Sequence, residues 1–482
     1  MGFYQMAESQ KLIVNFGRNV SFRPREIETP RTEDEVLEIL KRHCGRKIRA
    51  IGRLHAWSEA PSGDDVIIDL RNLNEVRTER RDGGIWATIG SGCQIKRVLT
   101  ELDRQAGATT PSVGLISEQA LAGAISTGTH GSGKNSLSHY AAEFRIAMYD
   151  PETGEPVIRT ISEGPELRAA RCSLGCLGVI VSIGLWARPK YNVEEQFRCH
   201  STLEGVLKEE AEHPLQQFFL IPWSWTFYGQ HRREVADSRS WLASLYRLYF
   251  FLTFDIGMHL VLLLFTRWLP FRGGLKFFFR QVIPWTVVRK WKVIDNSSDM
   301  LIMENELFVH IETEVFVKRS QLPTALPFVI EMIRHFDGEA GALSPASQQR
   351  LRELGLWEEV VSGARTYTHH YPICVRRILP DDTLISMASS DDEDYYSISI
   401  VSVAKPSERD GFFRFSEILA STMATLFAAR LHWGKYCPTD SKAVTNLYPH
   451  LHEFRSICNH ADVHGRFRNN WVDRLIFGST PE

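Results

Sequence analysis

The first 190 residues contain short apolar runs separated by turns, which is typical of a mixed α and β domain. Val66–Leu70 and Ile85–Ile89 are apolar stretches of strand length. Across Gln94–Leu102 the apolar side chains recur at helical spacing, so we predict an amphipathic helix there. Glu166–Cys172 predicts a further helix and Gly178–Trp186 a closing strand. Because the helices are short and irregularly spaced, the pattern predicts an α+β fold rather than a regular βαβ repeat.

Strict alternation of polar and apolar positions returns in the second half of the chain. Asn305–Val317 alternates throughout, which predicts a half-buried strand whose polar face meets water or a cavity. Tyr371–Leu379 and Tyr395–Val403 predict two more strands, and Cys374 and Arg376 would share a face of the first of these. The polar face of the alternating strand would carry Glu306, Phe308, His310, Glu312 and Glu314. We therefore expect a second domain built on a sheet.

Between these halves lies a segment of unusual composition. Leu245–Lys292 holds eight basic residues and one acid, Asp255, and Leu248–Thr266 within it is almost wholly apolar. Apolar, aromatic and basic side chains interleaved in this way suit a bilayer interface. Three interpretations remain open: a helix that lies on a membrane, a helix that spans it despite the central Asp255, and a helix buried in the second domain.

The bulk composition excludes some classes of function. A net charge of −2 gives no electrostatic indication of nucleic-acid binding. The eight cysteines are scattered and form no CxxC pair, so we expect reduced thiols and no metal site. The N-terminus has no apolar core of a secretory signal, and we expect a cytoplasmic protein with peripheral membrane association.

The glycine-rich stretch LAGAISTGTHGSG (residues 121–133) predicts a loop pressed against a ligand, because only glycine lets a backbone approach so closely. Its end nearly spells a nucleotide-binding P-loop, with Gly128, Gly133 and Lys134 in place. Asn135, however, stands where Ser or Thr must bind magnesium. The earlier turn Gly52–His55 is marked by glycine in the same way. Neither stretch has the spacing of a Rossmann fingerprint, so a pyrophosphate-containing cofactor held in another way is expected.

Five segments together resemble one family. They are IGRLHAWSEAP (51–61), EQALAGAISTGTHGSG (118–133), SLGCLGVI (173–180), LHWGKYCP (431–438) and GRFRNNW (465–471). This set resembles the vanillyl-alcohol-oxidase-type FAD-binding proteins, in particular the aldonolactone oxidase group with its gulonolactone and arabinonolactone oxidases. The resemblance implies a two-subdomain FAD-binding domain over residues 1–190 and a sheet-based cap domain over 191–430. It also implies that a C-terminal segment, 431–482, returns to the flavin.

The resemblance also assigns residues. His55 takes the position of the histidine that carries FAD covalently in this family, although Ala56 replaces the usual serine. Arg376, Lys435 and Glu314 are the implied catalytic residues. Cys374 stands where the family has a glutamate two residues before the arginine, so a sugar-binding carboxylate is missing there. The implied cofactor-binding residues are Gly52, Arg53, Leu54, His55, Ala56, Gly123, Ser126, Thr127, Gly128, Thr129, His130, Gly131, Ser132, Gly178, Val179, Ile180 and Lys435.

The function that this resemblance implies is FAD-dependent oxidation of a hydroxyl-bearing carbon in a sugar-derived lactone or polyol. Electrons would pass to oxygen or to a membrane carrier. One alternative keeps the flavin but takes a lipid-linked sugar or another hydrophobic alcohol, which the cysteine at position 374 and the apolar segment favour. The others are a P-loop nucleotide hydrolase and a binding protein without a cofactor.

Overall fold

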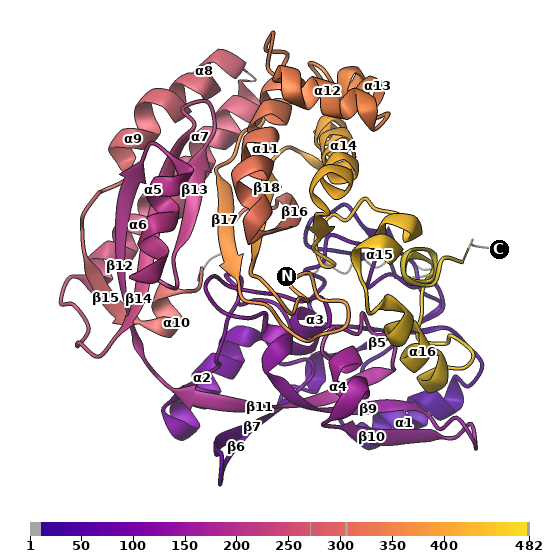
Figure 1. Cartoon of the computed structure of the whole chain (residues 1–482). Coiled ribbons are helices and arrows are strands. Elements are labelled where there is room, and N and C mark those ends of the chain that lie inside the picture. Colours follow the sequence, from indigo (N-terminus) through magenta and orange to yellow (C-terminus); the bar gives the residue numbers. More distant parts are fainter. Residues whose placement is uncertain (1–10, 270, 304–306, 480–482) are drawn as a thin grey trace.

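The computed structural model describes residues 11–269, 271–303 and 307–479. The first ten residues lie outside these ranges, and the prediction that they form no secretory signal rests on them. Glu306 of the predicted alternating strand also lies outside. The predicted α+β architecture, with a second domain built on a sheet, is confirmed. In Figure 1 the N-terminal half forms one end of the molecule and the cap sheet with its helices forms the other.

The N-terminal half contains two sheets. A small parallel sheet has the order β3-β5-β4, and a larger antiparallel one the order β10-β9-β11-β7-β6, with β8 paired to β11. The strands of both sheets are β3 (Glu26–Glu28), β4 (Ile48–Ile51), β5 (Val66–Asp69), β6 (Val76–Arg81), β7 (Gly84–Gly90), β8 (Ala108–Thr109), β9 (Ala141–Tyr149), β10 (Pro156–Ile161) and β11 (Val179–Pro189). A two-stranded pair, β1 (Ile13–Val14) and β2 (Ser21–Phe22), precedes them.

The helices of this half cover the sheets with their apolar faces. They are α1 (Glu33–Arg42), α2 (Ile95–Ala106), α3 (Leu121–Ser126) and α4 (Gly164–Ala170). Helix α2 buries Ile95, Val98, Leu99 and Leu102, which is the face that the sequence pattern predicted, and it ends at Gly107 in a left-handed conformation. All five elements predicted in this half are present with small shifts of their ends.

The cap is built on an eight-stranded antiparallel sheet of order β15-β12-β14-β13-β17-β18-β16-β19. Its strands are β12 (Asn192–His200), β13 (Gln217–Ile221), β14 (Thr226–Val235), β15 (Val293–Asn296), β16 (Ile311–Lys318), β17 (Ile373–Ile378), β18 (Tyr395–Ser402) and β19 (Arg430–Leu431). Helices α11 (Leu322–Asp337) and α14 (Asp410–Phe427) pack on β16. The C-terminal helices α15 (Ser441–Leu447) and α16 (Leu451–Ala461) follow β19.

The predicted alternating strand differs from expectation in two ways. Strand β16 begins only at Ile311, and both of its faces are buried rather than one. The reason is that its polar face covers an internal cavity while its apolar face meets α11 and α14. Burial on both sides explains why Glu312 and Glu314 need partners inside the protein.

The apolar segment forms one continuous helical stretch followed by a shorter one. The first comprises α6 (Ala243–Phe250), η4 (Phe251–Met258), α7 (His259–Leu263) and η5 (Leu264–Trp268), and the second α8 (Arg272–Phe277), η6 (Phe278–Val282) and α9 (Ile283–Thr286). Residues Ala243–Trp268 have a mean hydropathy of 2.0, and only 17% of the most apolar window is buried. The interpretation as a buried core helix is therefore wrong for most of this stretch, which lies along one outer edge of the molecule (Figure 1).

Candidate functional site

Two cavities meet at the junction of the N-terminal half and the cap. The larger, of about 530 Å³, lies between the cap sheet and the helical stretch from α6 to α9. The second is lined by the loop after β4, by α3 and by the entry to β11. Gln119, His432 and Lys435 belong to the walls of both. A molecule in the second cavity would therefore reach the inner end of the first at these three side chains.

The second cavity brings together most of the predicted cofactor-binding residues. The loop after β4 and helix α3 approach each other so closely that a Cβ on Gly52 would lie 2.5 Å from that of Ala120, which explains the glycine. Leu54 adopts a left-handed φ of 56° in the same loop. The predicted residues in this wall are Gly52, Arg53, Leu54, His55, Ala56, Gly123, Ser126, Thr127, Gly178, Ile180 and Lys435.

The rest of the glycine-rich loop has other neighbours. Thr129 and His130 line the larger cavity, and Gly131 and Ser132 line a small separate one. Gly128 packs against Met387, while Val179 is buried in β11 opposite Ala147. These six predicted residues thus lie outside the wall of the second cavity.

The end of this loop attaches to the cap rather than to a phosphate. The backbone N–H of Gly133 donates to the carbonyl of Arg377 at 2.7 Å, and a Cβ on Gly133 would overlap Pro214 O. Lys134, the lysine of the P-loop pattern, forms an ion pair with Glu234 at 2.7 Å. The glycine at position 133 is therefore explained by close packing against the cap. Because this part of the loop and Lys134 both bind the cap, they do not form a phosphate site, which argues against the P-loop alternative.

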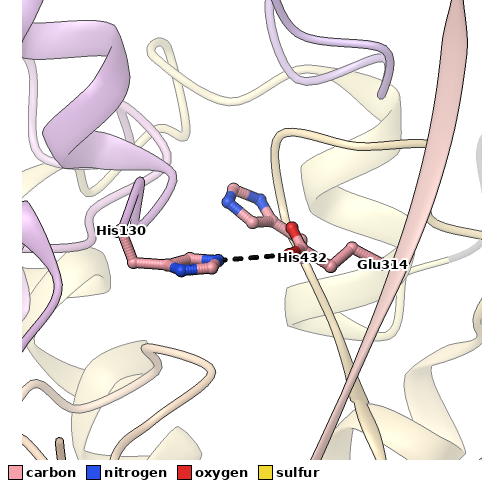
Figure 2. Close-up of side chains that lie close together, drawn as sticks. All are labelled: His130, Glu314 and His432. Atoms are coloured by element: carbon pink, nitrogen blue, oxygen red, sulfur yellow. Dashed lines mark ion pairs between the residues drawn. The ribbon is translucent and has the colours of Figure 1, made fainter. Parts of the chain in front are cut away.

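A buried cluster of Glu314, His130 and His432 stands in the wall of the larger cavity (Figure 2). Glu314 projects from β16, His130 from the glycine-rich loop and His432 from the segment after β19. His130 Nε2 lies 3.4 Å from Glu314 Oε1, and this oxygen has no hydrogen-bond partner among the described residues. The sequence placed His130 against the cofactor, whereas the structure turns its ring toward Glu314.

The protonation states in this cluster follow from its hydrogen bonds. His432 Nδ1 accepts the backbone N–H of Gly434 at 2.9 Å, so the neutral ring carries its proton on Nε2 and burial lowers its pKa. His130 Nδ1 lies 3.0 Å from the carbonyl of Gly131, which leaves Nε2 as the ring's free acceptor. Burial alone would raise the pKa of Glu314, but His130 and His432 in their protonated forms, together with Lys435, hold it well below its usual range.

Lys435 is held at the point where the cavities meet. Its Nζ lies 2.5 Å from Glu312 Oε2 and 4.4 Å from the centre of the Trp57 ring. Ser399 on β18 donates a further hydrogen bond to Glu312. A tight turn through Gly434 places the lysine there, since Lys435 N donates to the carbonyl of His432 at 3.0 Å. The result is a fixed cation between two cavities.

Arg376 and Cys374 lie on the cavity face of β17. Strand β18 lies between β17 and β16, and its Ser399 pairs with both Cys374 and Glu314. Arg376 is half-buried, and its Nε donates to Gln217 Oε1 at 3.0 Å. Although burial alone would lower it, Cys374, Glu314 and Glu312 raise the pKa of Arg376, so the guanidinium stays charged.

Sequence reasoning missed a polar chain that holds Arg376. Glu195 and Arg232 form a buried ion pair at 2.6 Å on neighbouring strands β12 and β14. Gln230 donates to Glu195 at 2.8 Å, and Gln217 donates to Gln230 at 2.6 Å. In the sequence these residues are charged or polar positions within strand-like runs. Such positions have the same pattern whether they face water or the interior, so only the tertiary structure shows that they are buried.

Much of the remaining wall of the larger cavity is apolar. Phe197, Phe219 and Ile221 come from the sheet, and Phe250, Phe254, Met258, Ile283 and Val287 come from the helical stretch. Charged side chains other than Glu314, Arg376 and Lys435 also line it, and they include Glu195, Arg232, Arg247, Asp255 and Asp299. A mainly apolar molecule with a polar group matches such a wall.

Comparison with known proteins places these features in context. A model of the FAD binding domain matches residues 24–150, and a model described as D-arabinono-1,4-lactone oxidase matches residues 252–475. A long-chain alcohol oxidase from an uncultured marine euryarchaeote is 50% identical over 462 residues, which are 96% of either chain. An L-gulonolactone oxidase from Scyliorhinus torazame is 24% identical over 96% of this chain and 98% of its own.

The fold has solved counterparts. The crystal structure of cholesterol oxidase from B. sterolicum superposes with a TM-score of 0.70 at 13% identity, and the match covers 99% of this chain and 100% of that one. At this identity the likeness concerns the fold alone.

Proposed function

We propose, from the premise that this chain belongs to the FAD-dependent oxidoreductases that carry a D-arabinono-1,4-lactone oxidase domain, that it oxidises a long-chain primary alcohol to the aldehyde. The observation that carries this proposal is the cavity of about 530 Å³, whose wall is mainly apolar and includes Glu314, Arg376 and Lys435, the last of which also lines the second cavity. A relative with half of its residues identical is named a long-chain alcohol oxidase. The predicted sugar lactone stays a prediction, and the mainly apolar wall of the cavity favours an alkyl chain over a sugar.

The second cavity suits the family's cofactor. Its wall combines the close approach of two backbone segments at Gly52 with a histidine, His55, whose ring stacks on Phe16 at 5.1 Å between centroids. When bound, FAD supplies the acceptor for the hydride from the alcohol carbon. The flavin would end where Lys435 and His432 line both cavities. The reduced flavin would then be reoxidised by oxygen or by a membrane electron carrier.

Glu314 and His130 would accept the hydroxyl proton of the alcohol. Oxidation removes a hydride from the carbon and a proton from the hydroxyl group, and the free Oε1 of Glu314 is positioned to accept that hydroxyl hydrogen bond. His130 Nε2, 3.4 Å away, can then take the proton and pair as a cation with Glu314. Lys435 and Arg376 would place positive charge beside the negative charge that develops during hydride transfer.

The first test of this function is a series of substrates of increasing chain length. Burial of each methylene contributes about 0.8 kcal/mol, so kcat/KM should rise roughly fourfold per carbon and more than about 100-fold from hexanol to decanol. L-gulono-1,4-lactone serves as the hydrophilic comparison. Flavin reduction by this lactone as fast as by decanol, measured anaerobically by stopped flow, would contradict the proposal.

We also propose that His55 carries the flavin covalently. Burial lowers the pKa of His55 to about 4, so its ring is neutral, and able to act as a nucleophile, above about pH 5. Acid precipitation should leave the yellow colour in the pellet of the wild-type protein and in the supernatant of His55→Ala. His464→Ala, an exposed histidine elsewhere, is the matched control. A yellow pellet from His55→Ala would rule out this tether.

We also propose that the protein attaches to a lipid bilayer. Among the described residues, twelve of the sixteen large apolar side chains that are exposed lie between positions 241 and 288. They are Trp241, Leu245, Leu248, Leu252, Leu260, Trp268, Leu269, Phe271, Phe277, Val282, Trp285 and Val288. Exposed cations accompany them at Arg272, Arg280, Arg289 and Lys290. Apolar side chains ringed by cations complement an anionic membrane surface.

This surface adjoins the opening of the larger cavity. Leu248 is 52% exposed and also lines the cavity, as does Leu307 at 51%. An alcohol dissolved in the bilayer could therefore enter between the helical stretch and the cap sheet without crossing water. The same helices would hold the protein on the membrane with one face and shape the substrate cavity with the other.

Binding to vesicles tests this attachment. The wild-type protein should sediment with vesicles of phosphatidylcholine and phosphatidylglycerol. Phe271→Ser combined with Phe277→Ser should weaken binding about 100-fold, because each buried phenylalanine contributes about 1.5–3 kcal/mol. Val463→Ser, which removes an exposed apolar side chain outside the segment, should change nothing. Equal sedimentation of the double variant and the wild type would contradict the proposal.

A further inference from the structure

We propose that Glu209, His213 and His231, with His200 as a fourth ligand, form a site for a divalent metal ion such as Zn²⁺. These four residues, here called the histidine cluster, lie on the outer face of the cap sheet, away from both cavities. The sequence predicted no metal site, because the ligands are spread over three elements and show no compact spacing. The inference is independent of the proposed function.

The topology explains how the four side chains meet. Gln196 on β12 pairs with His231 on β14, which puts His231 and His200 on the face opposite to the cavity-lining Phe197 and Gln230. The short helices α5 (Leu203–Leu207) and η3 (Lys208–Ala211) fold back over this face and supply Glu209 and then His213. Ligand atoms of Glu209, His213 and His231 all lie within 4.8 Å of one another.

The hydrogen bonds around the rings leave nitrogen lone pairs facing inward. Gln216 donates its amide N–H to the carbonyl of Val206 at 3.1 Å, so its oxygen is the acceptor for His231 Nδ1 at 2.7 Å. His213 Nδ1 lies 3.2 Å from the carbonyl of Glu209. His231 therefore carries its proton on Nδ1 and presents Nε2 as an unprotonated nitrogen, which is the arrangement typical of metal-binding histidines. His213 Nδ1 also lies 3.5 Å from Glu209 Oε2.

The distances suit a shared ion. His200 Nε2 and His231 Nε2 lie 3.0 Å apart and form a hydrogen bond, so a metal ion would take the place of the proton that they share. Two nitrogens at about 2.0–2.1 Å from a tetrahedral zinc ion are separated by about 3.3 Å. Arg198 donates a hydrogen bond to Glu209 Oε2 at 2.8 Å, so a metal ion would bind the other carboxylate oxygen. Three nitrogens and one oxygen form a ligand set that zinc accepts.

The sheet is shaped around these rings. A Cβ on Gly229 would lie 2.5 Å from His231 Nε2, so the glycine opposite Arg198 leaves the space in which the imidazole sits. His231 is 1% exposed and His213 is 6% exposed. A bound ion would join β12, β14 and η3 behind the wall of the larger cavity.

Metal content measured on the intact protein tests the inference. After treatment with a chelator and dialysis against Zn²⁺, elemental analysis should find one equivalent bound, with a higher Tm than the chelated protein. Co²⁺ in its place should give the visible absorption of a tetrahedral nitrogen-ligated site. His213→Ala and His231→Ala should each lose the equivalent, the cobalt absorption and the gain in Tm.

Two further variants keep the test decisive if those buried replacements fold poorly. His200→Ala and Glu209→Gln alter less buried ligands and should lower affinity for Zn²⁺ by at least about tenfold, in the range expected for loss of one interaction at a metal site. His464→Ala, at an exposed position, should bind like the wild type. No bound metal in the wild type, or one equivalent retained by all four cluster variants, would overturn the inference.

Discussion

Replacing Lys435 by methionine should slow flavin reduction by about 10²–10³-fold, the effect typical of removing one preorganised group that stabilises developing charge. Methionine keeps most of the apolar stem and the packing on Trp57 but removes the cation where the two cavities meet. The loss should fall on the reduction step, because the lysine faces the place where charge develops. Anaerobic stopped-flow measurement with decanol isolates this step.

Lys405→Met provides the control, since Lys405 is an exposed lysine paired with Glu408. Arg376→Met measured in the same way should show a loss of similar size, because its guanidinium lines the same end of the cavity. Removing Lys435 leaves Glu312 buried without its cation, so folding must be verified by the Tm and the flavin content. A folded, flavin-loaded Lys435→Met protein that reduces its flavin at the wild-type rate would refute the role.

The replacement Glu314→Gln should lower flavin reduction by about 10²–10⁴-fold, the range that general base catalysis contributes. Glutamine preserves the volume of the side chain but cannot accept the proton of the alcohol or stabilise a protonated His130. Asp392→Asn, an exposed carboxyl on a loop of the cap, is a suitable control. Reduction of the variant at more than one tenth of the wild-type rate would argue against this role.

The same carboxyl predicts a pH dependence of stability. His130, His432 and Lys435 hold the pKa of Glu314 below its ordinary value of 4.5 in the folded protein. A lowered folded pKa contributes stability that is present above about pH 4.5 and is lost as the pH falls toward the folded pKa. The Tm of the wild type should therefore fall more steeply than that of Glu314→Gln below about pH 4.5. Parallel Tm curves for the two proteins would contradict the lowered pKa.

Much of the fold could be predicted because its signals are local. Alternation in β18, helical spacing in α2 and the glycines around residue 52 each depend on a few neighbouring residues. The resemblance carried by the segments around His55 and His432 pointed to FAD chemistry, which the FAD-binding domain supports. The predicted domain boundaries are still predictions, although the one near residue 190 lies between β11 and β12.

The candidate site was predicted less completely. The glycines from 128 to 133 looked like one ligand-binding loop, but half of that loop packs against the cap. The buried chain from Glu195 to Arg376 was invisible, because charged residues in a strand have the same pattern whether they face water or a cavity. The histidine cluster could not be predicted because its members are far apart in the sequence. They come from β12, from β14 and from η3 with the residues just after it.

The sequence by itself determined the elements, the cofactor-type loops and the identities of Lys435, Arg376 and Glu314 as candidate catalytic residues. The tertiary structure decided which of these side chains share a wall, that His130 faces Glu314, and that all three line one mainly apolar cavity. The physical reason is that periodicity specifies which residues share a face of one element. Which faces then meet depends on burial and packing among segments hundreds of residues apart, as between His130 and His432.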